Sequence, residues 1–377
     1  MISKILILEP EVNGHKAFYL SLILDALSSF SLTVLSRVND PGFLDHCRLR
    51  GIDLDQVNLL DVGDRTRHEL IAFARELCQS QSFSSVFIPY LDHLFPLLLE
   101  KPDYFSVPVR GIWFNPHALD TRYRWLPPLD KRLRMRRATH LGLRGLTSSE
   151  WIQHLYLLDP HSVNAMKAVN PLVPATFLPD PGESLPSMTQ SEALEHLGLP
   201  GDRLVFLHAG SPEKRKGFPD LLGAFSRLIE DGHLPRKPLL IRVGPNDRLD
   251  SCHRRLLSRL EADGYVYCTN DFVSRADFMN YFSACDWVTL PYRNFRFSSG
   301  ILANAILAQK PVVASDYGYI GRRVSGEQLG VVYKHGSCRS LTRVLKQIFF
   351  GKIKTPRVAV DSAYIADHFV QSLKKTF

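Results

Sequence analysis

The chain has 377 residues, of which 45% are hydrophobic and 22% are charged, and its formal net charge is +8. This size and composition predict a globular protein of two domains. No run approaches the roughly 18 apolar residues that a membrane span needs. The six cysteines are scattered without paired spacing, which excludes a disulfide scaffold. We expect a cytoplasmic protein, either free or peripheral at the inner face of a membrane.

Strands and helices alternate through the N-terminal half. The apolar patterns predict strands at 4–8, 32–35, 85–88, 109–114 and 145–149, and helices at 17–28, 71–79 and 151–157. The helix at 17–28 reads as amphipathic. Such alternation favours a parallel, doubly wound sheet.

A stretch rich in Pro, Ser and acidic residues, 171–191, indicates an interdomain linker. A second alternating set follows from residue 204 to about 350, and a last helix is expected at 362–375. We therefore predict an N-terminal domain at 1–180, a C-terminal domain at 181–355 and a terminal helical segment at 356–377.

The segment 122–144 is strongly basic, with Asp130 as its single acid and apolar residues between its cations, which are Arg122, Arg124, Lys131, Arg132, Arg134, Arg136, Arg137 and Arg144. One interpretation is a solvated helix face whose long stems cover apolar surface. The functional interpretations are contact with an anionic membrane surface or with an anionic, lipid-linked acceptor. No nucleic-acid module is recognisable, so we expect no nucleic-acid partner.

A small-residue turn at Ser298, Ser299 and Gly300 lies between a strand end at 289–291 and a helix at 301–308. Unpaired amide groups and the helix dipole make such a turn an anion site. The alternative is an ordinary serine cap that binds nothing.

A basic loop with Lys214, Arg215 and Lys216 follows the strand that ends at Gly210. Ligands of open parallel sheets bind at the carboxyl ends of the strands, where this loop lies. Cations there can stabilise a diphosphate leaving group. A solvated lysine run is the alternative.

From residue 204 to 332 the chain resembles the nucleotide-sugar domain of family 4 retaining glycosyltransferases of the GT-B type. The resemblance is carried by the order and spacing of five motifs: LVFLHAG at 204–210, Lys216-Gly217, LLIRVG at 239–244, DFMNYFSACDWVTLP at 277–291, and the helix, Pro-Val-Val strand and glycine at 305–318.

The resemblance implies an α/β fold of two Rossmann-like domains that face each other across a cleft, with the C-terminal helix returning to the first. It assigns the acceptor to 1–180 and the nucleotide-sugar donor to 181–355. The implied activity is transfer of a sugar from a nucleotide-diphosphate donor, of UDP or GDP type, to a hydroxyl of a glycan or lipid-linked acceptor. No metal is required, so Asp53-Leu54-Asp55 is not interpreted as a metal motif.

The resemblance also suggests roles for individual residues. Lys216 and the Ser298–Gly300 turn would hold the diphosphate beside Gly210, and Arg215 would replace a family arginine that is Ser211 here. His117 would steer the donor sugar, and Gly14 would lie in a flexible loop near the donor phosphate.

Two family glutamates are replaced, by Arg296 and Asn304. Asn304 can still bond a ribose hydroxyl, and Arg296 can pair with a phosphate but cannot imitate a carboxylate. A divergent active subgroup is the preferred interpretation. The alternative is an inactive pseudo-glycosyltransferase that serves as a binding or scaffold subunit.

Overall fold

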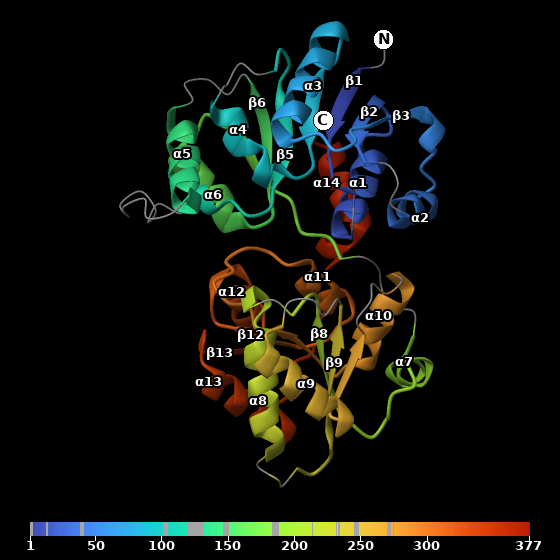
Figure 1. Ribbon diagram of the computed structural model, residues 1–377, viewed down its shortest axis with the longest axis vertical. Coiled ribbons are helices and arrows are strands. Elements are labelled where there is room, and N and C mark those ends of the chain that lie inside the picture. The colour runs from blue at the N-terminus through green and yellow to red at the C-terminus, as the bar shows by residue number, and fades with distance from the viewer. Residues whose placement is uncertain are drawn as a thin grey trace. The chain divides into compact units, whose positions relative to one another are not determined.

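The computed structural model describes residues 3–377 except 13, 38–40, 101–104, 120–130, 146–150, 183–187, 213, 231, 233, 245–248, 270–272 and 274. Residue contacts divide the chain into two compact units (Figure 1). The first comprises Met1–Pro179 with Asp367–Phe377, and the second is Asp180–Ala366. The sequence had placed the division after residue 180 and the start of the terminal segment at 356, whereas residues 356–366 group with the second unit.

The first unit contains a seven-stranded parallel sheet with the order β3-β2-β1-β4-β5-β6-β7. Its strands are β1 (Lys4–Leu8), β2 (Ser31–Ser36), β3 (Val57–Asp61), β4 (Ser85–Ile88), β5 (Val109–Trp113), β6 (Ile152–Leu157) and β7 (Ala175–Phe177). The order in which successive strands are added to the sheet reverses between β1 and β4. Doubly wound sheets bind ligands at this position.

The helices of this unit are α1 (His15–Ala26), α2 (Pro41–Leu49), α3 (Arg67–Ser80), α4 (Phe95–Glu100), α5 (Lys131–Gly145), α6 (Pro160–Val169) and the terminal α14 (Ala366–Lys374). The expectation that the first helix is amphipathic is wrong, because α1 is buried along nearly its whole length. The reason is that α2 packs on it and α14 returns to cover it.

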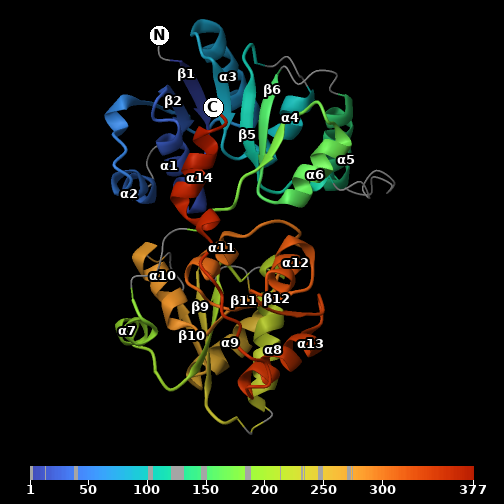
Figure 2. The same cartoon turned by 180° about the vertical axis from the view of Figure 1, so that it is seen from behind.

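The returning helix is fastened to the first unit at several points, and Figure 2 shows α14 beside α1. The rings of Tyr19 and Phe369 meet edge to face with centroids 5.4 Å apart. Lys374 lies 3.6 Å from Asp25. Beyond the helix, the hydroxyl groups of Tyr156 and Thr376 are hydrogen-bonded at 2.7 Å.

Three expectations for residues 145–191 need correction. Residues 151–157 were predicted as a helix, but Ile152–Leu157 is strand β6, which pairs with β5 and β7. Leu155, Tyr156 and Leu157 are buried in succession, so this strand lacks the alternation that identifies half-buried strands. Part of the expected linker is strand β7. Gly145 ends α5, and the rest of the strand expected at 145–149 lies outside the described residues.

The second unit contains a six-stranded parallel sheet with the order β10-β9-β8-β11-β12-β13. Its strands are β8 (Leu204–Ala209), β9 (Pro238–Val243), β10 (Val266–Thr269), β11 (Trp287–Leu290), β12 (Val312–Ser315) and β13 (Gly330–Tyr333). Its helices are α7 (Gln190–His196), α8 (Phe218–Glu230), α9 (Ser251–Ala262), α10 (Arg275–Ala284), α11 (Gly300–Leu307), α12 (Gly318–Gly326) and α13 (Cys338–Phe349).

Successive residues of β8 enter opposite cores of the second unit. Leu204 and Phe206 pack with α8 and α13, and Val205 and Leu207 pack with α10 and α11. Both faces of the sheet are therefore covered by helices. With the same strand order in both units and α14 on the first, the predicted fold class is confirmed. No helix in the described part of the chain is long and apolar enough to cross a membrane.

Candidate functional site

The candidate site lies in the second unit, at the carboxyl ends of β8 and β11. These adjacent strands flank the point where the strand order reverses, which is where doubly wound sheets bind ligands. The loop after β8 carries Gly210 and the short 3₁₀ helix Lys214–Lys216. The loop after β11 runs from Pro291 to Ser299, where α11 begins.

The backbones of the two loops are in direct contact. Gly217 has a φ of 71°, and a Cβ at this position would lie 1.7 Å from the carbonyl oxygen of Pro291. Only glycine allows this approach. The amide of Arg293 also donates to the carbonyl of Arg215 at 2.8 Å. The basic loop is consequently held against the loop after β11.

A hydrogen-bonded chain connects the two loops through their side chains. The ammonium group of Lys216 donates to the hydroxyl of Tyr292 at 2.7 Å, and that hydroxyl lies 3.1 Å from Oγ of Ser299. Because an ammonium group only donates, the Tyr292 oxygen is the acceptor from Lys216, and either hydroxyl can donate in the contact with Ser299. Tyr292 is 2% exposed. The sequence singled out Lys216 and Ser299 but not Tyr292; the available signal was an aromatic residue directly after a strand-closing proline.

Ser299 is the N-cap residue of α11, but its side chain makes no capping hydrogen bond. Its carbonyl accepts from the amide of Leu302 at 2.9 Å, while its hydroxyl faces Tyr292. The first amides of the helix, those of Gly300 and Ile301, have no such internal acceptor. Ordinary serine capping therefore does not explain Ser299, and the half-buried Ser298 precedes it. A helix start of this kind suits an anion.

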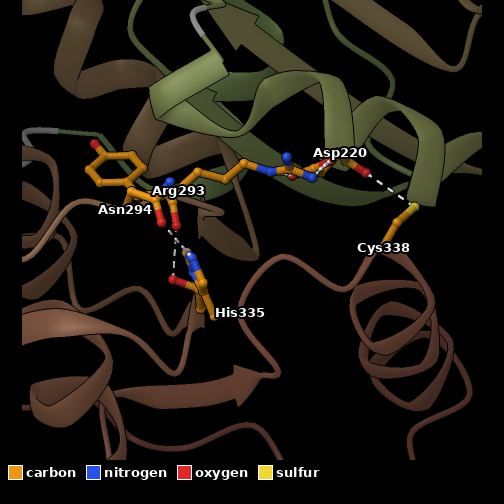
Figure 3. Close-up of polar contacts among 7 residues, drawn as sticks. Asp220, Arg293, Asn294, His335 and Cys338 are labelled. Carbon is orange, nitrogen blue, oxygen red and sulfur yellow. Dashed lines mark hydrogen bonds and ion pairs between the residues drawn. The ribbon is translucent and has the colours of Figure 1, made fainter. Parts of the chain in front are cut away.

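A second set of contacts joins the loop after β11 to Asp220 of α8 and to His335, which precedes α13 (Figure 3). The guanidinium of Arg293 pairs with both carboxylate oxygens of Asp220 in the first turn of α8. The amide oxygen of Asn294 lies 3.2 Å from Nε2 of His335 and can only accept, so the ring nitrogen is the donor. Sγ of Cys338 lies 3.7 Å from the carbonyl oxygen of Asp220. The first two contacts fix the loop at Arg293 and Asn294, the two residues after Tyr292.

Arg296 and Asn304, which the sequence resemblance aligns with two family glutamates, lie on this loop and on α11. The Nε of Arg296 donates to the hydroxyl of Tyr317 at 2.7 Å, and its carbonyl accepts from the amide of Tyr319. Arg296 thus connects the loop to α12. Asn304 is 3% exposed and faces Gly182, where a Cβ would lie 2.9 Å from the amide oxygen of Asn304.

The positive charge near the loops comes from lysine rather than from histidine. A Cβ at Gly210 would lie 3.8 Å from Nζ of Lys216. Two residues earlier, His208 is fully buried in β8. Burial, aided by the nearby charges of Lys216 and Arg242, lowers the pKa of His208 to about 3, so its ring is neutral. The sequence analysis did not single out this histidine.

Of the predicted site residues, Lys216, Arg215, Gly210, Arg296, Asn304 and the Ser298–Gly300 turn all lie in these loops and in α11. Gly14 and His117 belong to the first unit. Gly14 has a φ of 51° and precedes α1. His117 begins the short 3₁₀ helix His117–Leu119 after β5, and its amide donates to the carbonyl of Asn115 at 2.6 Å.

The first unit carries two carboxyl groups at the ends of β1 and β4 that the sequence analysis missed. Glu9 is 1% exposed, and burial raises its pKa to about 7 although Lys16 lies 3.5 Å away. Asp92 accepts from the amides of Phe114 and Asn115 at 3.0 and 2.8 Å. Burial nevertheless raises the pKa of Asp92 to about 6. The sequence signal was an acidic residue within a few positions of a buried strand.

Aromatic rings surround this second set of polar groups. The centroids of Tyr90 and Phe114 are 4.7 Å apart, and the ring of His15 lies 6.4 and 6.1 Å from them. The ammonium of Lys16 lies 4.9 Å from the centroid of Tyr90. Rings beside a few polar groups are typical of pockets for small neutral ligands.

The acidic pair that resembles a metal motif has a local structural role. An oxygen of Asp53 accepts from the amide of Asp55 at 3.1 Å and caps the short helix that follows. Among the residues that the structure describes, no three His, Cys, Asp or Glu side chains are grouped as metal ligands.

The C-terminal part of the basic segment forms α5, which packs on α4. Its exposed face carries Arg134, Arg137 and Arg144. Two large apolar side chains on this helix are also exposed, Met135 by 45% and Leu141 by 51%. Residues 122–130 of the segment lie outside the described residues.

Residues 203–349 match the protein family described as glycosyl transferases group 1. A comparison of the sequence with curated proteins gave no match. Among solved structures, HepE of Anabaena in complex with UDP-glucose has a TM-score of 0.69 and 16% identity, covering 99% of this chain and 98% of that one.

Two further solved structures have the same arrangement of elements. WaaG, a glycosyltransferase involved in lipopolysaccharide biosynthesis, has a TM-score of 0.67, 15% identity and coverage of 98% and 94%. Sucrose-phosphate synthase from Thermosynechococcus elongatus has a TM-score of 0.66, 15% identity and the same coverage. At this identity the likeness establishes the fold. The chain has the two-domain GT-B fold, and within it residues 203–349 of the second unit match the glycosyl transferases group 1 family.

Proposed function

We propose that the protein transfers a sugar from a nucleotide-diphosphate donor to a hydroxyl of a glycan or lipid-linked acceptor, with retention of anomeric configuration. The observation that carries the proposal is the Lys216–Tyr292–Ser299 chain at the start of α11, where the Ser299 side chain makes no capping hydrogen bond. A cation facing a helix N-terminus is complementary to a diphosphate. In this proposal Ser298, Ser299 and Gly300 bind the diphosphate opposite Lys216, with Arg215 beside it.

The proposed reaction exchanges one bond to the anomeric carbon for another. The bond from the anomeric carbon to the diphosphate oxygen breaks, and a bond to the acceptor oxygen forms on the same face of the sugar. The acceptor proton passes to the departing phosphate oxygen. Lys216 stabilises the negative charge that develops there, and His117 steers the sugar. Lys216 and the α11 amides supply the positive charge, so no metal is required.

A UDP donor is favoured over a GDP donor, because the fold is shared with a protein solved in complex with UDP-glucose. Asn304 is the candidate for the ribose contact. On the acceptor side, the rings and carboxyl groups near Gly14 suit a neutral glycan hydroxyl.

The exposed cations and apolar side chains of α5 support association with an anionic membrane surface, where a lipid-linked acceptor would be found. Arginines near such a surface attract it, and exposed side chains such as Leu141 can enter the interface.

The alternative is an inactive relative that binds a nucleotide and serves as a scaffold subunit. Its specific support is Arg296, which stands where the family has a glutamate and whose Nε is bonded to Tyr317. A residue so engaged gives no acceptor to the donor sugar.

One experiment separates the two functions. The purified chain is incubated with UDP- and GDP-sugars, and NMR follows release of the nucleotide and the anomeric form of the released or transferred sugar. Turnover with a retained anomer supports transfer. Nucleotide binding without turnover of any donor supports the scaffold function, and an inverted anomer contradicts the proposed mechanism.

A further inference from the structure

A groove with a cavity volume of about 640 Å³ lies between α8 and α13, outside the candidate donor site. The two helices pack against each other, and Figure 1 shows them side by side in the second unit. The α8 helix starts beside the basic loop at Lys216, but it contributes Arg227 and Glu230 from its last turn to the groove. These residues lie roughly 15 Å along the helix from that loop.

The lining of the groove is strongly cationic. It contains one carboxylate, Glu230, against five cations, which are Arg227, Arg339, Arg343, Lys346 and Lys352. The carboxylate is already engaged, because Ser226 donates to it at 2.8 Å and Arg259 lies 3.6 Å from it. Neither of these partners lines the groove.

The cations on α13 share one helix face. Arg339 and Arg343 are four residues apart, and Lys346 follows three residues later. Like charges at this spacing repel and destabilise a helix. Within the described part of the chain, Arg227, Arg339 and Arg343 form no ion pair. All three are exposed, so a ligand can reach them. A bound anion would relieve the repulsion.

We propose that this groove is a second binding site, for a phosphate-bearing anion distinct from the sugar donor. Guanidinium groups from two helices converge on it, and guanidinium pairs with phosphate bidentately. The volume is within the range of small-ligand sites. The phosphate can belong to a free metabolite or to a lipid headgroup, for which Phe350, exposed by 46% at the end of the groove, offers an apolar contact.

The test compares two variants of the full chain with the same loss of charge. The groove variant is Arg339→Gln with Arg343→Gln. The control is Arg236→Gln with Arg255→Gln, both exposed residues of the second unit outside the groove. Both are made in a Lys216→Ala background to weaken pyrophosphate binding at the donor loops. Isothermal titration with inorganic pyrophosphate tests the free-phosphate source, and cosedimentation with vesicles of equal parts phosphatidylcholine and phosphatidylglycerol tests the lipid source.

The groove variant should bind at least one of the two probes about tenfold or more weakly than the control, because each lost charged contact contributes on the order of tenfold. Weakened pyrophosphate binding identifies a free phosphate, and weakened vesicle binding alone identifies a headgroup. Equal binding of both probes by the groove variant and the control overturns the proposal. None of these outcomes depends on sugar transfer, so failure here leaves the proposed function intact.

Discussion

The two units have the same strand order around their switch points, but they place different chemistry there. At the ends of β8 and β11 the second unit presents Lys216 and the N-terminus of α11. At the ends of β1 and β4 the first unit presents two buried carboxyl groups, Glu9 and Asp92, whose pKa values burial raises to about 7 and about 6. One edge is thus complementary to an anion, and the other suits a neutral, hydrogen-bonding ligand. A shared fold positions the sites, and a few loop residues decide what each can bind.

The variant Lys216→Ala tests the proposed anion site of the second unit most directly. Removing a charge that faces a bound diphosphate should weaken nucleotide binding by about 4 kcal/mol, close to a thousandfold. Titration calorimetry with UDP, GDP and ADP measures the effect. Lys214→Ala, an exposed lysine in the same short helix, is the matched control and should bind nearly as well as the unmodified chain. Equal binding by the two variants would remove Lys216 from the site.

The carboxyl side is tested by Glu9→Gln. Burial raises the pKa of Glu9 from its ordinary value of 4.5 to about 7 in the folded chain. Between these pH values the folded chain keeps a proton that the unfolded chain has lost, so the free energy of unfolding falls as the pH rises. The variant removes this fall and should be more stable above pH 7 by up to about 3 kcal/mol.

Urea unfolding at a series of pH values measures the free energy of unfolding of the variant. Glu11→Gln serves as the control, because the contacts of Glu11 with Lys16 lower the pKa of that exposed carboxyl instead. An unchanged pH slope in Glu9→Gln would contradict the role given to the buried carboxyl group.

The exposed basic face of α5 in the first unit is a second predicted contact for anions. Replacing Arg134 and Arg137 on α5 with Gln should weaken binding to phosphatidylglycerol vesicles by about 2 kcal/mol, since each basic residue near such a surface contributes about 1 kcal/mol. Cosedimentation measures it, and Arg236→Gln with Arg255→Gln controls for net charge. Nucleotide binding should not change. Vesicle binding equal to that of the control would return α5 to a solvated helix face.

The smallest expected effect belongs to Tyr292→Phe, which removes only the hydroxyl between Lys216 and Ser299. We expect nucleotide binding about fivefold weaker, near 1 kcal/mol, because Lys216 loses its positioning hydrogen bond. Tyr265→Phe, elsewhere in the same unit, is the control. The variant Tyr292→Ser also carries a hydroxyl, but its side chain is too short to contact Lys216, so nucleotide binding should stay weak. Unchanged affinity in Tyr292→Phe would show that the chain of hydroxyl groups does not position the lysine.

The sequence by itself determined the alternation of strands and helices, the GT-B arrangement and the location of the Lys216 and Ser299 loops. These depend on local signals, namely apolar runs, strand-closing glycines and residues that begin a helix. Only the tertiary structure decided that 152–157 is a strand, that α1 is buried by the returning α14, and that Tyr292 joins the two loops. It also decided the raised pKa values of Glu9 and Asp92. Burial is set by neighbours distant in the chain, so no local pattern can report it.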